Sequence, residues 1–131
     1  MKIGRRSMIA GMAGLASLGL APPVRAWARG TAMYGLIGRM TAIEGQRDAL
    51  TAILLESLGR MPGCLSYVVA HDPADDHAIW VTEVWIDEAA HRASLQLPEV
   101  REAIRRGRPL IATFGDAQVT APVGGVGLLQ P

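Results

Sequence analysis

The sequence contains no Asn, a single Cys and a single Lys among its 131 residues. Cys64 has no second thiol with which to form an intramolecular disulfide, and it opens an apolar run, so we expect a small buried side chain. The lysine is Lys2, so the chain after residue 28 contains none. Chemistry that passes through a lysine Schiff base is therefore excluded from that part.

A glycine-rich phosphate-binding loop is also lacking. Such a loop follows a strand and opens a helix. The glycines at 11 and 14 lie in the N-terminal segment, and the glycine-rich run 124–127 precedes no helix pattern. We therefore predict no flavin, nicotinamide or other cofactor.

Residues 1–28 have the three zones of an export signal. Lys2 and the pair Arg5-Arg6 are followed by the uncharged apolar run 8–20, and small residues stand at Ala26 and Ala28. The arginine pair resembles a twin-arginine signal. A membrane anchor is the alternative, but 13 helical residues span only about 20 Å of the ~30 Å hydrocarbon core. We expect cleavage after Ala28, a periplasmic or secreted protein, and membrane contact only during export.

Loss of this segment reverses the net charge. Nine Arg remain against all 12 Asp and Glu, which gives a net charge of −3. A negative domain has no field to attract a phosphate backbone, so we predict no nucleic-acid partner.

The rest of the chain divides into a short linker over 29–33, one domain over 34–120 and a Gly- and Pro-rich tail over 121–131. The predicted strands are 34–42, 65–71, 78–86 and 110–120, and the predicted helices are 50–61, 87–97 and 98–106. Asp87 is a suitable N-cap, with Ile86, Ala90, Ala93 and Leu97 expected to face the core. The order β-α-β-β-α-β predicts a ferredoxin-like α+β fold, with the helices on one face of a four-stranded antiparallel sheet.

Both faces of the predicted strand 78–86 are apolar. Ile79 and Trp85 alternate with Trp80 and Val84 along it. Helices can cover only one of these faces, and soluble monomers avoid a large exposed apolar patch. We therefore expect a homodimer.

Three segments carry a resemblance to a known family. Pro62-Gly63-Cys64-Leu65-x-Tyr67, the turn at 72–75 and the run 83–91 resemble the antibiotic biosynthesis monooxygenase domain family. The resemblance runs from about Tyr34 to Val119. It implies a dimeric α+β barrel and, for quinol-type members, cofactor-independent oxidation of an electron-rich aromatic by O₂ to a quinone.

The same resemblance argues against haem degradation. Relatives with that activity use an Asn on the first strand, which this chain lacks, and a His on a later helix where Ser94 stands here. Many other relatives also have a His at the position of Glu99. Both histidines are absent, so a non-catalytic periplasmic dimer that binds a small aromatic or apolar ligand is the alternative. A detoxifying or stress-related dimer of another activity is a third possibility.

Cofactor-free oxidation of a phenol needs a base, a group that stabilises the phenolate and flat apolar walls. The candidate bases are His71 and His91, and Arg39 is the candidate for holding the phenolate. The candidate stacking residues are Tyr67, Trp80, Trp85 and Phe114.

Structural roles are the alternative for each of these residues. The tryptophans could be core or dimer contacts, and Arg39 could pair with Glu83 on a neighbouring strand. Arg101, Arg105 and Arg108 are predicted to form a solvated helix face, with an ion pair between Glu102 and Arg106.

The segment 71–77 combines two histidines with three aspartates, and such a set could bind a divalent ion. Its spacing matches no standard site, and a turn around Pro73 explains the acidic residues. We predict no metal site.

Overall fold

The computed structural model describes residues 32–56, 58 and 61–128. The predicted export segment 1–28 lies outside the described residues. The strands are β1 (Tyr34–Ala42), β2 (Cys64–His71), β3 (Ala78–Trp85), β4 (Ile111–Phe114) and β5 (Gln118–Thr120). The helices are α3 (Arg47–Glu56), α4 (Glu88–Ser94), α5 (Pro98–Gly107) and the 3₁₀ turn η1 (Arg108–Leu110).

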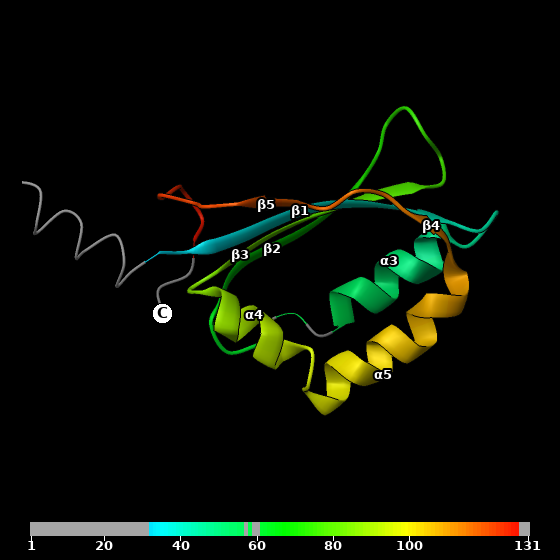
Figure 1. Cartoon of the computed structure of the whole chain (residues 1–131). Helices are drawn as coiled ribbons and strands as arrows, with labels where there is room; N and C mark the ends of the chain where they lie inside the picture. Colours follow the sequence, from blue (N-terminus) through cyan, green and yellow to red (C-terminus); the bar gives the residue numbers. More distant parts are fainter. Residues whose placement is uncertain (1–31, 57, 59–60, 129–131) are drawn as a thin grey trace, which may run out of the picture. The chain divides into compact units, whose positions relative to one another are not determined.

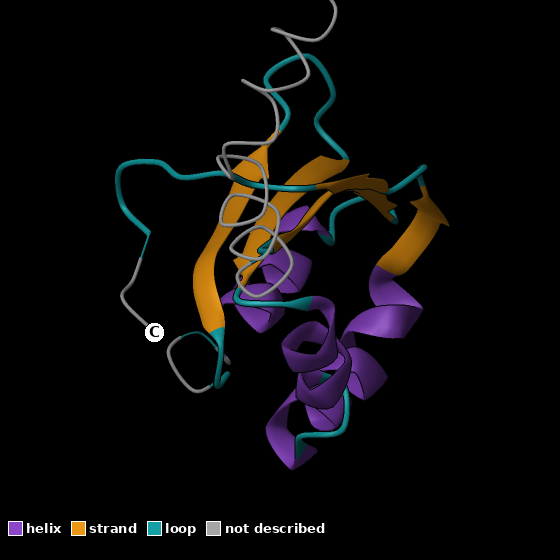
Figure 2. Ribbon diagram, turned by 60° about the vertical axis from the view of Figure 1, so that its left-hand side comes forward, coloured by secondary structure: helices purple, strands orange, loops and turns teal. Residues whose placement is uncertain are grey.

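The strands form one antiparallel sheet in the order β2-β3-β1-β4, and β5 also pairs with β1. The helices all lie on one face of this sheet (Figures 1 and 2). The prediction of a ferredoxin-like α+β fold is therefore confirmed. No helix in the described part of the chain combines the length and apolar character needed to cross a lipid bilayer.

The last strand was predicted as one segment over 110–120, and this prediction is wrong. β4 pairs with one end of β1 and β5 with the other, separated by residues 115–117. The backbone N–H of Gly115 donates to the carbonyl of Arg39 at 2.7 Å. A Cβ at Gly115 would stand 2.9 Å from that same oxygen, so the close approach of the two chains requires glycine here.

The covered face of the sheet holds the core. Ala42, Ile79 and Val81 from β1 and β3 pack with Leu50 of α3 in a buried cluster. α5 packs beside α3 on the same face of the sheet. Its buried Gly107 lets α3 and α5 approach closely, since a Cβ at this position would lie 3.3 Å from Leu50 Cδ1. Leu54, which belongs to the apolar face predicted for the first helix, packs against this cluster.

The start of α4 follows the sequence prediction, and its buried face follows it in part, since Ala90 and Leu97 are half-buried. Asp87 caps the helix by accepting the N–H of Ala90 at 2.8 Å. Ala93 and Ile86 are exposed, whereas Ser94 is buried and His91 packs on Trp85. Residues 91 and 94 are one helical turn apart and so lie on one face, toward the sheet.

Candidate active site

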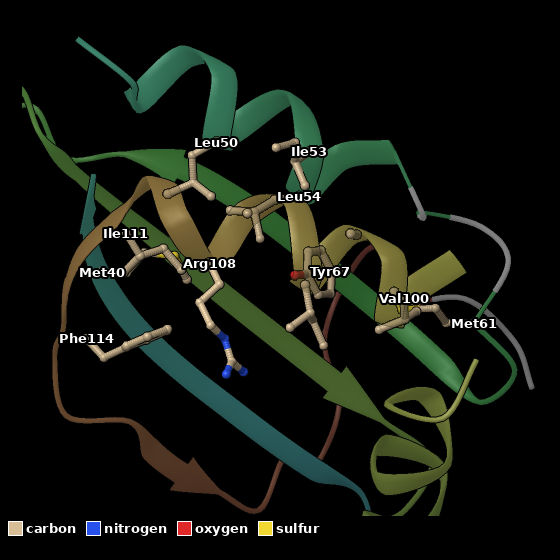
Figure 3. Close-up of a pocket in the computed structure, with 13 residues that line it drawn as sticks. Met40, Leu50, Ile53, Leu54, Met61, Tyr67, Val100, Arg108, Ile111 and Phe114 are labelled. Carbon is tan, nitrogen blue, oxygen red and sulfur yellow. The ribbon is translucent and has the colours of Figure 1, made fainter. Parts of the chain in front are cut away.

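An apolar cavity of about 300 Å³ lies between the covered face of the sheet and the helices α3 and α5 (Figure 3). It is lined by Met40, Leu50, Ile53, Leu54, Met61, Tyr67, Val100, Ala103, Ile104, Gly107, Arg108, Ile111 and Phe114. A cavity of this size lies at the small end of the range for ligand sites in proteins, roughly 300–1,000 Å³. It suits a compact flat molecule.

Among the described residues, two lining side chains are polar, Tyr67 and Arg108. Figure 3 shows both projecting into the cavity, with Arg108 between Tyr67 and Phe114 in this view. Phe114 is 68% exposed and so stands at the mouth. The cavity therefore offers one phenolic hydroxyl and one guanidinium within an otherwise hydrocarbon surface, an arrangement that can hold a flat ring and a single oxyanion.

Tyr67 is a hydrogen-bond donor in this site. Burial raises the pKa of its hydroxyl, and the negative charges of Glu83 and Cys64 raise it further. The hydroxyl stays protonated at neutral pH and has no hydrogen-bond partner among the described residues. It is free to donate to a bound ligand.

Arg108 was missed as a site residue by the sequence analysis. The spacing of Arg101, Arg105 and Arg108 predicted a single solvated helix face. Arg108 caps α5 in helical conformation, with its N–H bonded to the Ile104 carbonyl, so it lies one turn beyond Ile104 and lines the cavity with it while remaining exposed. Its spacing of four residues from the apolar Ile104 is the signal that could have located it. The predicted Glu102–Arg106 pair is confirmed, at 3.7 Å.

The structure brings only two of the predicted site residues into the cavity, Tyr67 and Phe114. Trp85 is 1% exposed in the core below α4. His71 lies at the far end of β2, exposed, with its Nε2 2.9 Å from the Thr51 hydroxyl. The site roles predicted for all of these residues remain predictions.

His91 belongs to a second polar cluster on the covered side of the sheet. Its ring packs against Tyr34 and Trp85, with centroids 5.4 and 5.5 Å apart. Its Nε2 lies 3.8 Å from the Glu83 carboxylate, which also accepts the Trp85 indole N–H at 2.8 Å. Glu83 is only 18% exposed, and burial raises the pKa of its carboxyl.

Arg39 and Trp80 lie on the opposite, uncovered face of the sheet. The predicted pairing of Arg39 with Glu83 is wrong, because Arg39 is the register partner of Trp80, whereas Glu83 faces the helices. Arg39 instead binds the β2–β3 loop, with contacts of 3.5 Å to Asp72 and 2.8 Å to Asp75. The Trp80 indole also donates to Asp72, at 3.1 Å.

The acidic loop 72–76 is held by hydrogen bonds. The backbone N–H of Ala74 is the main influence that lowers the pKa of Asp72, followed by Trp80 and Arg39. The N–H of His77 does the same for Asp75. Within the described residues no three His, Cys, Asp or Glu side chains converge on a common point where a metal ion could bind.

Comparison with known proteins gives the family. The model of the family described as antibiotic biosynthesis monooxygenase matches residues 33–106. The chain belongs to this family. No curated protein matches it by sequence. The resemblance seen in the sequence is thereby confirmed, and the domain is of the monooxygenase type.

Solved structures agree with this assignment. A candidate antibiotic biosynthesis monooxygenase from Chloroflexus aurantiacus J-10-fl is 61% identical, with a TM-score of 0.71, over 73% of this chain and 98% of that one. A second such candidate, from Caulobacter crescentus CB15, is 15% identical, with a TM-score of 0.65, over 72% and 92%. A mutant of SnoaB, a cofactor-independent oxygenase from Streptomyces nogalater, is 18% identical, with a TM-score of 0.60, over 72% and 96%. The last two show the shared fold.

Proposed function

We propose that this protein is a cofactor-independent monooxygenase that oxidises a hydroquinone or a polycyclic phenol to a quinone with O₂. The observation that carries the proposal is the apolar cavity into which, among the described residues, Tyr67 and Arg108 alone bring polar side chains. The solved relative SnoaB is a cofactor-independent oxygenase, which supports the same reaction class.

The chemistry needs little from the protein beyond this cavity. A phenolate passes one electron to O₂, and the radical pair recombines to form a carbon–oxygen bond. The hydroperoxide then loses water, so one oxygen atom enters the quinone and the other leaves as water with the two hydrogens of the substrate. The Arg108 guanidinium and the Tyr67 hydroxyl would hold the phenolate oxygen, and the apolar walls would exclude water.

Oxygen uptake by the purified, chelator-treated full chain tests the proposal. With hydroquinones and fused-ring phenols we expect uptake above autoxidation and a product that has gained one oxygen and lost two hydrogens, labelled once when ¹⁸O₂ is used. Arg108→Gln should lower kcat/KM by about 10²–10³, the usual effect of losing one oxyanion donor. Arg101→Gln, exposed on α5 outside the cavity, is the matched control.

A ligand-binding domain without turnover is the second candidate. One observation favours it, since no imidazole or carboxylate lines the described cavity. Saturable binding of the same aromatics, with oxygen uptake no faster than autoxidation, would replace the monooxygenase by this function.

We also propose that the protein is a homodimer. The uncovered face of the sheet carries Trp80 and Val68, 38% and 53% exposed, beside Ile37. A second copy of the same face would remove them from water. Val68→Asp should convert a dimer into a monomer in sedimentation analysis, and a wild-type monomer at micromolar concentration would refute this.

Export by the twin-arginine route is a separate proposal that rests on residues 1–28 of the sequence alone. Replacement of Arg5 and Arg6 by Lys should retain the precursor in the cytoplasm. The N-terminal residue of the exported protein should be Arg29.

A further inference from the structure

The proposed function leaves two sulfur atoms of the cavity wall unused. Met40 of β1 and Met61, which lies between α3 and β2, both line the cavity. The chain has six methionines, and those at positions 1, 8 and 12 belong to the predicted export segment. Of the remaining three, two line this cavity, and the third, Met33, does not. The domain thus places most of its thioethers around one ligand-sized space.

The two methionines share this space with the polar groups of the site. Met40 and Met61 lie toward opposite ends of the lining residues in Figure 3, and Tyr67 and Arg108 lie between them in this view. Both methionines are half-buried. The thioethers therefore border the space in which the hydroxyl and the guanidinium would hold the oxygen atoms of a ligand.

The chain's single thiol, Cys64, does not compete with these thioethers for an oxidant in the cavity. It does not line the cavity, and its S–H donates to the Ser66 carbonyl at 3.6 Å. Burial raises the pKa of this thiol, so it stays protonated at neutral pH, whereas peroxides react with the thiolate. A thioether has no proton to lose, and its oxidation to the sulfoxide needs no ionisation.

We propose that Met40 and Met61 accept an oxygen atom from an aromatic hydroperoxide held in the cavity, and that the sulfoxide formed weakens binding of the aromatic substrate. The inference rests on the proposed function for the source of the hydroperoxide, which is the intermediate of the oxygenation. The sulfur lone pair attacks the outer oxygen of R–O–O–H, the O–O bond breaks, and the hydroperoxide proton moves to the inner oxygen. The products are the alcohol R–OH and methionine sulfoxide, so the sulfur loses the two electrons that the peroxide gains.

The donors that suit a phenolate also assist this step. The inner oxygen gains negative charge as the O–O bond breaks, and Tyr67 and Arg108 can donate hydrogen bonds to it. The sulfoxide then places a polar oxygen in a hydrocarbon wall, which disfavours an aromatic ring. Each hydroperoxide thus either loses water to give the quinone or oxidises a cavity methionine and lowers further activity. Reduction of the sulfoxide restores the site.

Cumene hydroperoxide, a small aromatic hydroperoxide, tests the site without turnover. The chelator-treated full chain is exposed to it, and the sulfoxide at each methionine is followed by peptide mass spectrometry. We expect Met40 or Met61 to be oxidised about tenfold or more faster than Met33, because a bound peroxide acts at a high effective concentration. 4-Nitrophenol, which is too electron-poor to be oxidised by O₂, should slow the cavity oxidation and leave Met33 unchanged when it saturates the cavity.

Met33 is the internal control, since it is half-buried like the other two and lies outside the cavity lining. Leucine has a volume close to that of methionine, so Met40→Leu/Met61→Leu should stay folded. After peroxide treatment this double variant should keep its affinity for 4-nitrophenol, whereas wild type and Met33→Leu should lose most of theirs. Equal oxidation rates at the three methionines, or no protection by bound 4-nitrophenol, would overturn the proposal.

Turnover under ¹⁸O₂ separates this inference from the proposed function. With a hydroquinone, and with catalase to remove free H₂O₂, we expect one labelled atom in the sulfoxide of a cavity methionine. The other should enter an alcohol that has gained one oxygen and lost no hydrogen. Labelled quinone with Met40 and Met61 unoxidised would refute the regulation and leave the monooxygenase. Oxidation of these residues by cumene hydroperoxide, without oxygen uptake on any phenol, would refute the monooxygenase and leave the oxygen-acceptor site.

Discussion

Arg39 and Asp75 are joined across the uncovered face of the sheet, with 2.8 Å between Nη2 and Oδ2. The same guanidinium lies over the Trp80 ring, 5.9 Å from its centroid. Arg47 donates to the carbonyl of Asp75 from the other side, at 3.0 Å. The β2–β3 loop is thus fixed to β1, and a charged side chain in an apolar strand obtains its partners.

The two arginines Arg39 and Arg108 lie on opposite sides of the sheet, so their roles can be separated by mutation. We expect Arg108→Gln to reduce kcat/KM for a phenol far more than Arg39→Gln does, because only Arg108 lines the cavity. Arg39→Gln should instead speed hydrogen exchange in residues 72–77, which lose the Asp72 and Asp75 contacts. A larger kinetic effect at Arg39 would place the reaction on the uncovered face.

Gly35 should be intolerant of any side chain. A Cβ there would overlap the Thr120 hydroxyl and stand 2.9 Å from Pro122, so Gly35→Ala must displace β5 or the segment after it. We expect a loss of about 1–3 kcal/mol in the free energy of unfolding, the usual cost of overpacking. Gly38→Ala on the same strand is the control, because a Cβ there meets nothing within 4 Å. Equal urea midpoints for the two variants would contradict this account.

Alternation along the strands was readable from the sequence, and it separated Trp80 from Trp85 correctly. The relative register of the strands was not readable. Whether Arg39 shares a face with Glu83 or with Trp80 depends on a shift of one residue between β1 and β3, which no local pattern specifies. The Arg39–Glu83 pair failed for this reason.

Residues that start or end helices and strands were correct predictors of element boundaries where the sequence analysis used them. Asp87 and Pro98 mark the starts of α4 and α5 as expected, since each supplies what a helix N-terminus needs. Gly115 lies in the break that divides the last strand, and it was overlooked within a longer pattern. The cavity is built from six separate elements and Met61. The sequence could therefore indicate individual lining residues, but not that they meet in one cavity.

Leu50 serves both the core and the cavity, and it is 1% exposed. Leu50→Ala should lower the free energy of unfolding by about 2–5 kcal/mol, through lost burial and the space left behind. The same change enlarges the site, so a bulkier fused-ring phenol should gain affinity relative to a small hydroquinone. Denaturant unfolding and competition binding on one preparation check the two effects, and unchanged ligand preference would show that the helices collapse into the space.

Glu83 should make stability fall as pH rises. Its folded-state pKa is raised above the unfolded value by burial, so its contribution is fully present below the ordinary pKa of 4.5 and is lost as pH rises through the folded-state pKa. Glu83→Gln removes this loss. We expect the stability of Glu83→Gln relative to wild type to increase with pH across that interval. The measurement is Tm from about pH 4 to 8, and parallel curves would contradict the shift.

The lowered pKa values of Asp72 and Asp75 act with the opposite sign, because their contribution disappears as pH falls. Both residues are present in wild type and in Glu83→Gln, so their effect cancels in the difference. An acid-side loss of stability that is shared by the two proteins is therefore expected and does not bear on Glu83.

The break between β4 and β5 divides the C-terminal part of the chain into a segment that lines the cavity and a segment that pairs with β1. The wall of the cavity ends at Phe114, and the β5 residues Gln118–Thr120 pair with the other end of β1. A sequence can therefore diverge, lengthen or acquire a fused peptide beyond Thr120 while the ligand-facing surface is inherited unchanged. In a protein engineered for a new aromatic substrate, the cavity and the terminal strand can be treated as independent design problems.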